Sequence, residues 1–489
     1  MLACLMCSVW LAMAKVAAAD ATGAGDWPQY RGPSSSGAST NGPALASRWP
    51  KEGPRKLWET FLAGQNGGCW GSPSVAEGRA YLMIMAWQYP VNPENLKAVV
   101  ALGVPAAAIE DLRTNGLYFN SVDDWLRKHG IPGDKKRAVQ EALGPAEAID
   151  RLACLDANTG KLLWKRDTFL NRCTGEKANW GTASVPCIWH GRVYGSLSKR
   201  TVYCVDAKTG QEVWSAKTGG NHASVAVAEG VVVSTGSGLV ALEAETGAEL
   251  WKGGSANGEY SPALWRFGGK MYVIYDTGGV GNPLRCKELA TGKDVWGCEA
   301  NCQSVAVEGT YMAAKCKGGT GGKGMLAIYS ISLDKPQKIG EVDITDVAAC
   351  PVICKGYVYY VGCGKAVCVD AATAKVKWEE PIPVSPRHDQ KGNSYSGQSL
   401  IWSSPIVADG KLFAVLDAAS GGHSNGGGTE PVGMFDANPE HFETLGVADA
   451  KLWGCTSPAV AGTKLFVHTA TGLACFDLAP DGAERSVGR

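Results

Sequence analysis

The sequence predicts an all-β fold built from repeated hairpins, and three observations lead to this prediction. A Thr-Gly pair precedes a tryptophan by a fixed spacing at four places, and a fifth copy has alanine for glycine: Thr159/Trp164, Thr209/Trp214, Thr246/Trp251, Thr291/Trp296 and Thr373/Trp378. An acidic residue lies four positions before each glycine or alanine: Asp156, Asp206, Glu243, Glu288 and Asp370. The chain also holds 63 glycines, as a chain dense in turns requires. Each copy is typical of a tight β-hairpin, because glycine tolerates the positive φ of such turns. Recurring hairpins of this kind indicate a repeat architecture.

The first nineteen residues predict an export signal. They are small and apolar, and Val16 to Ala19 supplies an Ala-x-Ala cleavage site before Asp20. The alternative is a membrane anchor, but the run is too short to span a bilayer well. We therefore expect a periplasmic or secreted protein.

The next segment predicts an extended arm followed by a lone strand. Residues 20–53 contain Trp27 to Pro33 and then a run rich in Ser, Gly, Thr and Pro. Arg55 to Leu62 resembles a Trp-bearing repeat strand without its hairpin partner, whereas Leu473 to Asp477 resembles the partner without the Trp strand. We expect these two half-units to pair and close the repeat into a ring, which removes exposed sheet edges.

Residues 54–489 predict eight four-stranded units, and therefore an eight-bladed β-propeller. Each unit begins with a short strand introduced by Ser-Pro or a similar sequence, at residues 71–75, 181–185, 221–225, 260–262, 301–305, 349–351, 403–405 and 456–458. A turn, usually containing glycine, leads to the second strand, and the Thr-Gly hairpin supplies the third and fourth. The fifth and seventh units carry degenerate turns.

Residues 91–148 interrupt the first unit and predict a small helical insertion. We expect helices from Pro105 to Arg113, from a capping box at Ser121 to His129, and from Asp134 to Leu143. Part of this segment is weakly similar to a helix-hairpin-helix, which would bind DNA. The alternative is a lid or docking element, and we favour it because acidic and basic residues balance here and, at 47 each, in the whole chain.

Most of the cysteines have no predicted chemistry. Five occupy the same repeat position, two residues before the acid: Cys154, Cys204, Cys286, Cys368 and Cys475. They are interpreted as small buried packing residues. Better disulfide candidates are Cys173 with Cys187, or Cys298 with Cys302. The repeat tryptophans are likewise interpreted as packing between units.

Candidate binding residues gather at one mouth of the predicted channel. Aligning the first strands gives one column of Ser72, Thr182, His222, Ser261, Cys302, Cys350, Ser404 and Ser457. Two residues earlier stand Trp70, Trp180, Glu259 and Trp402, with Tyr260 beside Glu259. The insertion, three long loops and the segment with Arg387 and His388 reach the same face, and such unequal elaboration indicates a site. The alternatives remain open: the tryptophans could plug the channel, His222 could bond a backbone carbonyl, and Arg387 and His388 could be solvated.

The repeat Ala/Val-x-Asp-Ala-x-Thr-Gly-Lys-x-x-Trp resembles that of the PQQ-like (pyrroloquinoline-quinone-type) β-propellers of exported proteins, over nearly the whole mature chain. That family includes quinoprotein dehydrogenases and the non-enzymatic propeller of the outer-membrane assembly machinery. The resemblance implies a quinoprotein-like propeller, with one of two functions.

The first is a monomeric, non-enzymatic binding or scaffold module for a protein, peptide or small molecule, without nucleic acid, metal or cofactor. The second is a dehydrogenase of alcohols or sugars that uses PQQ and calcium, with oxygen ligands from Glu259, Asn221, Asn301 and Asp276. We favour the first, because the chain has neither the adjacent cysteines nor the haem-attachment motif found in such enzymes. A third function, that of a hydrolase, is not supported, because the sequence contains neither a nucleophile elbow nor a metal-binding His pair.

Overall fold

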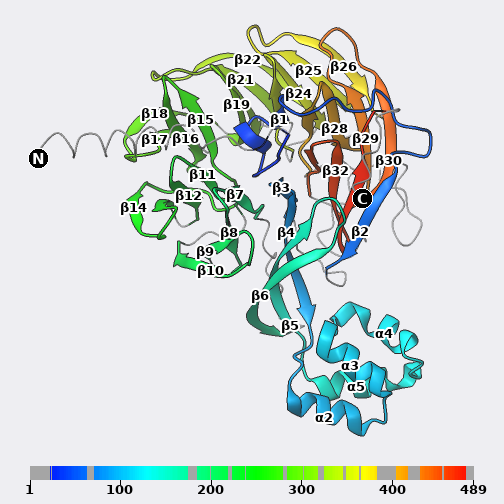
Figure 1. The fold of residues 1–489 in the computed structure, drawn as a ribbon. Helices are drawn as coiled ribbons and strands as arrows, with labels where there is room; N and C mark the ends of the chain where they lie inside the picture. The colour runs from blue at the N-terminus through cyan, green and yellow to red at the C-terminus, as the bar shows by residue number, and fades with distance from the viewer. Residues whose placement is uncertain are drawn as a thin grey trace, which may run out of the picture.

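The computed structural model shows a ring of twisted β-sheets with a helical element outside it (Figure 1). It describes residues 23, 25–62, 71–173, 184–198, 200–218, 223–236, 238–278, 283–300, 302–317, 324–344, 349–362, 365–382, 403–416, 430–453 and 456–480. Six sheets have four strands each, and a seventh has nine.

Within each four-stranded sheet the strands follow chain order and neighbours are antiparallel. The first three sheets comprise β3 (Ser74–Ala76), β4 (Arg79–Gln88), β5 (Glu147–Asp156) and β6 (Leu162–Cys173); β7 (Cys187–Trp189), β8 (Arg192–Leu197), β9 (Thr201–Asp206) and β10 (Glu212–Lys217); and β11 (Ala226–Ala228), β12 (Val231–Thr235), β13 (Leu239–Glu243) and β14 (Glu249–Lys252). The next three comprise β15 (Ala263–Phe267), β16 (Lys270–Asp276), β17 (Leu284–Glu288) and β18 (Asp294–Cys298); β19 (Cys302–Glu308), β20 (Tyr311–Lys317), β21 (Gly324–Ser330) and β22 (Gln337–Ile344); and β23 (Val352–Cys354), β24 (Tyr357–Gly362), β25 (Lys365–Asp370) and β26 (Val376–Pro381).

The nine-stranded sheet joins the two ends of the chain. It contains β1 (Ala38–Ser39), β27 (Ile406–Ala408), β28 (Lys411–Val415), β29 (Glu430–Asp436) and β30 (Thr444–Leu452), and then β31 (Ala459–Ala461), β32 (Lys464–Thr469), β33 (Gly472–Asp477) and β2 (Lys56–Phe61). β2 pairs antiparallel with β33, with Glu59 opposite Ala474, which confirms the predicted union of the two half-units. A salt bridge of 2.7 Å between Arg55 and Asp477 lies at the end of this pair.

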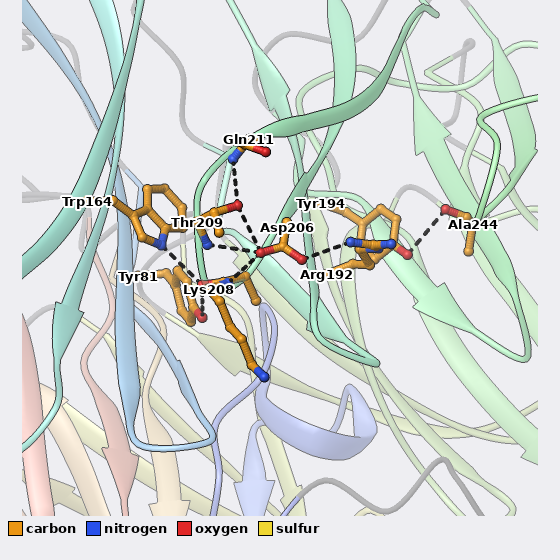
Figure 2. A network of polar contacts seen from close by, with 10 residues as sticks. Tyr81, Trp164, Arg192, Tyr194, Asp206, Lys208, Thr209, Gln211 and Ala244 are labelled. Carbon is orange, nitrogen blue, oxygen red and sulfur yellow. Dashed lines mark hydrogen bonds and ion pairs between the residues drawn. The ribbon is translucent and has the colours of Figure 1, made fainter.

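The repeat motif folds into a hydrogen-bonded turn, shown for the β9–β10 hairpin in Figure 2. One carboxylate oxygen of Asp206 accepts hydrogen bonds from the backbone of Lys208 and from the backbone and hydroxyl of Thr209, at 2.9–3.0 Å. The same three-bond pattern recurs around Asp156. The predicted acid therefore organises the turn, as expected of an Asx-type side chain.

The repeat tryptophans pack between sheets, as predicted. The indole of Trp164 donates from Nε1 to Ala207 O of the next sheet at 3.1 Å (Figure 2). A Cβ added to Gly210 would lie 2.6 Å from the same indole, so the glycine makes room for the ring as well as adopting a φ of +70°.

In the hairpin that has alanine instead of glycine, the two residue sizes are exchanged: the turn carries the larger residue and the neighbouring sheet carries the glycine. Ala374 has a φ of +54°, and the residue that faces it in the preceding sheet is Gly340, in the register position of a repeat tryptophan. A Cβ added to Gly340 would lie 2.7 Å from the Cβ of Ala374. Loss of the tryptophan is thus matched by loss of the glycine against which it would stack.

Long extensions of β4, β5 and β6 carry the helical element away from the ring (Figure 1). Its helices are α2 (Pro93–Ala101), α3 (Ala106–Asn115), η2 (Phe119–Ser121), α4 (Val122–Lys128), η3 (Gly133–Lys135) and α5 (Lys136–Leu143), with a shared apolar core. The sequence reasoning missed α2, which Asn92 caps by accepting hydrogen bonds from Glu94 N and Asn95 N. The predicted caps of the later helices are wrong, since Ser121 makes no side-chain cap and Asp134 lies inside η3.

Eleven cysteines of the described part of the chain are free and buried: Cys154, Cys187, Cys204, Cys286, Cys298, Cys302, Cys316, Cys350, Cys354, Cys368 and Cys475. Cys298 and Cys302, a predicted disulfide candidate, are therefore not bonded to each other in this structure. The five cysteines of the repeat position are packing residues, as predicted. Across the described ranges, no helix combines the length and apolar character needed to cross a membrane.

Candidate functional site

The arm of residues 25–39 crosses the ring near its axis, where Figure 1 shows η1 (Gly32–Ser34) and β1 in dark blue. Its backbone pairs with the first strands of sheets around the ring rather than lying over an outer surface. Trp27 exchanges two bonds of 2.8 Å with Val75, Pro28 O accepts from Ile188 N at 2.8 Å, and Gly37 O accepts from Val407 N at 2.9 Å. Further bonds run from Ile353 N to Ser36 O and from Gly462 N to Gly25 O. The arm therefore closes one side of the channel.

Arg31 fixes the arm in this position. Its side chain is 5% exposed, and Nη1 donates to Pro405 O at 3.2 Å while Nη2 donates to Pro351 O and Ser36 O. Arg31 has a φ of +66°, a conformation that side chains other than glycine rarely adopt. A strained backbone of this kind persists only where surrounding contacts hold it in place. The hydrogen bonds from the guanidinium group to backbone carbonyls are such contacts.

The serine column ties neighbouring sheets together above the arm. Ser457 N donates to Ser72 Oγ at 2.8 Å, Ser404 N to Ser457 Oγ at 2.9 Å, and Cys350 N to Ser404 Oγ at 3.0 Å. Ser224 N donates to Ser261 Oγ at 2.8 Å. Ser224 Oγ also accepts from Val185 N at 2.9 Å, whereas His222, which the sequence aligned with Ser72, lies outside the described residues. These hydroxyls have a structural role.

A buried polar cluster lies where β16 and β20 end beside the channel. We call Asn257, Tyr260, Asp276 and Lys315 the channel cluster. Lys315 is 1% exposed and its Nζ lies 5.7 Å from the centre of the Tyr260 ring, within cation–π range. Asp276, 5% exposed, accepts from Asn257 Nδ2 at 3.2 Å and from Gly278 N at 2.7 Å. Thr235 Oγ1 donates to Tyr260 O at 3.0 Å, which fixes the backbone of the tyrosine.

Burial controls the ionisation of the phenols in this region. It raises the pKa of Tyr260 to about 12, and the negative charges of Asp276 and Glu259 add to the shift. Burial also raises the pKa of Tyr30 to about 12, with the Cys350 thiol adding to the shift and Arg31 and a hydrogen bond from Ser404 opposing it. Tyr30 comes from the arm, so the arm contributes a neutral phenol to the channel. Both phenols therefore act as hydrogen-bonding groups, not as phenolates.

The structure brings two of the eight predicted binding residues to this cluster. Tyr260 is half-buried within it, whereas Glu259 is exposed beside it and donates from its backbone to Asn257 Oδ1 at 3.0 Å. The other six lie outside the described residues: Trp70, Trp180, His222, Arg387, His388 and Trp402.

Sequence reasoning missed Lys315 and Tyr30. A signal existed for Lys315, because it lies in the mostly apolar strand Tyr311–Lys317, where a charged residue is unusual. No comparable signal marks Tyr30, which lies in an aperiodic segment.

Asp276 and Asn257 supply three side-chain oxygens near one another in the cluster. Both carboxylate oxygens of Asp276 and the amide oxygen of Asn257 already accept hydrogen bonds from the protein. Calcium takes six to eight oxygen ligands, so these three would make up at most half of its coordination. Asn221 and Asn301, the other predicted ligands, lie outside the described residues.

A separate cavity of about 400 Å³ lies beside the arm, on the side of the turns between first and second strands. Its walls include Pro28, Gln29, Trp189, Trp265 and Met271. They are mainly apolar, and the exposed Arg266 at its edge is paired with Glu229 at 2.8 Å. This cavity has fewer buried polar groups than the channel cluster.

Comparison with known proteins gives a family model and several partial relatives. The model described as "Outer membrane protein assembly factor BamB" matches residues 148–313. The quinohemoprotein alcohol dehydrogenase ADH-IIG of Pseudomonas putida is 33% identical over 118 residues, 20% of this chain and 16% of that protein. The tetrathionate hydrolase of Acidithiobacillus ferrooxidans is 29% identical over 268 residues, 49% of this chain and 51% of that protein. The chain thus spans about half or less of these relatives.

Solved structures with similar folds include two from the same groups of proteins. BamB from Moraxella catarrhalis has a TM-score of 0.46 and 14% identity, covering 67% of this chain and 90% of that chain. The quinohemoprotein alcohol dehydrogenase ADHIIG from Pseudomonas putida HK5 has a TM-score of 0.47 and 14% identity, covering 94% of this chain and 78% of that chain.

Proposed function

Since the chain belongs to the PQQ-like β-propeller family, we propose that it acts as an exported binding module, without enzymatic activity. In this proposal a protein, peptide or small polar ligand enters the channel from the face to which the helical element and the channel cluster belong. One observation carries the proposal: the arm is bonded to the first strands of several sheets around the ring, from which we infer that it closes one mouth of the channel and leaves the other mouth open to a ligand.

The chemistry of the channel cluster supports a polar ligand. It combines a buried ammonium group, a carboxylate, an amide and a neutral phenol, which together can donate and accept hydrogen bonds. A concave site with few, well-placed polar groups is the usual form of a ligand pocket. The groups are held by hydrogen bonds of their own, which favours selective binding.

The proposal includes the architecture and location in which the site would work. We infer eight blades, counting β27–β30 and β31–β33 with β2 as two blades of the nine-stranded sheet. The helical element then belongs to the first blade, and the chain works as a monomer. The apolar first nineteen residues support export to the periplasm or the medium.

Site-specific photo-crosslinking tests the proposed mouth. A photoreactive phenylalanine analogue replaces Glu259, which is exposed beside the cluster, in the full chain expressed in cells that export it. The matched control carries the analogue at Lys208, which is exposed on a Thr-Gly turn at the opposite face. We expect discrete adducts from position 259 only. Equal labelling at both positions, or none at either, would contradict the proposal.

The alternative is a dehydrogenase dependent on PQQ and calcium, which the quinohemoprotein alcohol dehydrogenase relative favours. Calorimetric titration of the mature protein with PQQ plus calcium separates the two proposals. Saturable binding at one site, weakened by Trp70→Ala or Trp402→Ala, would support the dehydrogenase. No heat and no thermal shift would support the binding module.

A further inference from the structure

Two cysteines face each other across the first two strands of the β19–β22 sheet. Cys302 in β19 and Cys316 in β20 are direct cross-strand partners, beside a β-bulge. Directly opposed residues of antiparallel strands have Cα atoms about 4.5–5.5 Å apart, and disulfides span about 4.4–6.8 Å. Cys302 is fully buried and Cys316 is 9% exposed, and both belong to one apolar cluster. The backbone therefore places the two thiols where a bond can form.

We propose that Cys302 and Cys316 form a reversible disulfide when the protein meets an oxidising thiol–disulfide environment. The inference concerns a modification site and does not depend on the proposed function. The linked residues border the channel cluster, because Lys315 precedes Cys316 in the same strand. The disulfide would fix the β19–β20 pair at the point where it supports that lysine.

The environment of the two thiols gives them different roles. Their mutual hydrogen bond lowers the pKa of Cys316, while the same bond and burial raise the pKa of Cys302. Cys316 is also the more exposed, so it is the attacking thiolate. It attacks a small-molecule disulfide such as oxidised glutathione, forming a mixed disulfide and releasing one glutathione thiolate. Cys302 then loses its proton to solvent and attacks Sγ of Cys316, releasing the second glutathione, so two protein thiols are oxidised and one disulfide is reduced.

Peptide mapping of the purified full chain tests this proposal directly. The protein is incubated with oxidised glutathione, its free thiols are alkylated, and it is digested with trypsin without reduction. Cleavage after Lys293, Lys315 and Lys317 yields the peptide 294–315, which holds Cys298 and Cys302, and the dipeptide Cys316–Lys317. We expect the dipeptide attached to peptide 294–315 through Cys302, as fragmentation of the peptide reveals.

Three variants sharpen the test. Cys302→Ala should abolish the link and any rise in thermal midpoint on oxidation, whereas Cys298→Ala should keep both. Cys286→Ala is the matched control, because Cys286 is equally buried but faces Ile274 and Trp296 across its strands. Alkylation of both Cys302 and Cys316 in the oxidised wild type, or a bond between Cys298 and Cys302 instead, would overturn the proposal.

Discussion

At the scale of single residues, the stacking of a tryptophan on a glycine turn joins neighbouring sheets. Gly160, Gly210, Gly247 and Gly292 each have a positive φ of +70° to +73°, and each contacts the indole of the preceding sheet. The glycine thus meets two requirements at once, one set by the backbone and one by the neighbouring ring. Replacing one of these glycines should therefore lower the free energy of unfolding by more than the strain of the left-handed backbone alone.

Gly210→Ala tests this expectation against Gly78→Ala. Gly78 has a φ of +73° but nothing within 4 Å of an added Cβ, so its replacement should cost about 1–2 kcal/mol for the left-handed backbone. Gly210→Ala adds a collision with Trp164, for a total of about 2–4 kcal/mol. Urea unfolding of both variants measures the difference. Equal losses would show that the indole moves away without cost.

His468 links the stability of the protein to pH. It is 4% exposed, its Nδ1 donates to Gly71 O at 2.8 Å, and burial lowers its pKa to about 4, although the bond to Gly71 opposes the shift. The folded protein therefore holds this ring neutral, whereas the unfolded chain protonates it near pH 6.5. Because the unfolded state binds more protons between these values, stability must fall as the pH drops from about 6.5 to about 4.

His468→Asn should remove this dependence, since the asparagine amide can still donate to Gly71 O but does not titrate. The wild type should lose about 3 kcal/mol more than the variant between pH 7 and pH 4. Urea unfolding at several pH values gives the free energy of unfolding of both proteins. All other titrating groups are the same in the two proteins, so the difference between their pH profiles reports His468 alone. Parallel pH profiles of the two proteins would contradict the assignment.

At the scale of elements, the helical insertion has its own core but is not independent of the ring. Tyr118 accepts a hydrogen bond from Arg151 Nη1, and its hydroxyl donates to Leu62 O at 3.3 Å. Arg151 is 1% exposed and pairs with Asp167 at 2.6 Å through Nε. Removal of the helices would leave both members of this ion pair in the chain but would take away the phenol of Tyr118.

Deleting residues 93–145 and joining the ends of β4 and β5 should leave a folded ring. We expect a lower thermal midpoint, because Arg151 becomes solvated and loses the phenol. Tyr118→Phe in the full chain is the control, since it removes the hydroxyl alone and should cost about 0.5–1.5 kcal/mol. Circular dichroism and thermal unfolding report both changes. An insoluble deletion product would mean that the helices are needed for the ring to form.

At the scale of the whole molecule, residues 25–61 make two separate contributions. The arm closes the channel through backbone bonds to first strands, and β2 supplies the fourth strand beside β33. The first contribution adds contacts inside the ring. The second completes a sheet whose outer edge would otherwise be exposed.

Two truncations separate these contributions. A chain that starts at Gly53 keeps β2 and should fold with reduced stability. A chain that starts at Leu62 lacks β2 and should unfold at a much lower temperature or aggregate through the open edge of β33. Calorimetry and light scattering distinguish these results. Similar midpoints for the two truncations would mean that β2 contributes little to closing the ring.

The sequence reasoning succeeded where the information is local. The hairpins follow from turn chemistry within six residues, and the pairing of β2 with β33 follows because each is half of the same motif. It failed where contacts are long-range and use backbone atoms. The path of Trp27 to Gly37 across the axis depends on carbonyl and amide groups, which every residue has, so no pattern of side chains marks it. In the sheet, Cys302 lies opposite Cys316, fourteen positions away, whereas the sequence reasoning offered Cys298 as its partner.

The pairing of β2 with β33 also has a consequence for the order of events during synthesis. A ribosome makes Lys56–Phe61 early and Gly472–Asp477 almost last, so β2 has no strand partner while most of the chain is made. Contacts between such distant segments are slow to form, because the entropy of closing a long loop must be overcome first. Folding of the ring should therefore finish only after translation, and a chaperone that shields an exposed strand should act on this protein until then.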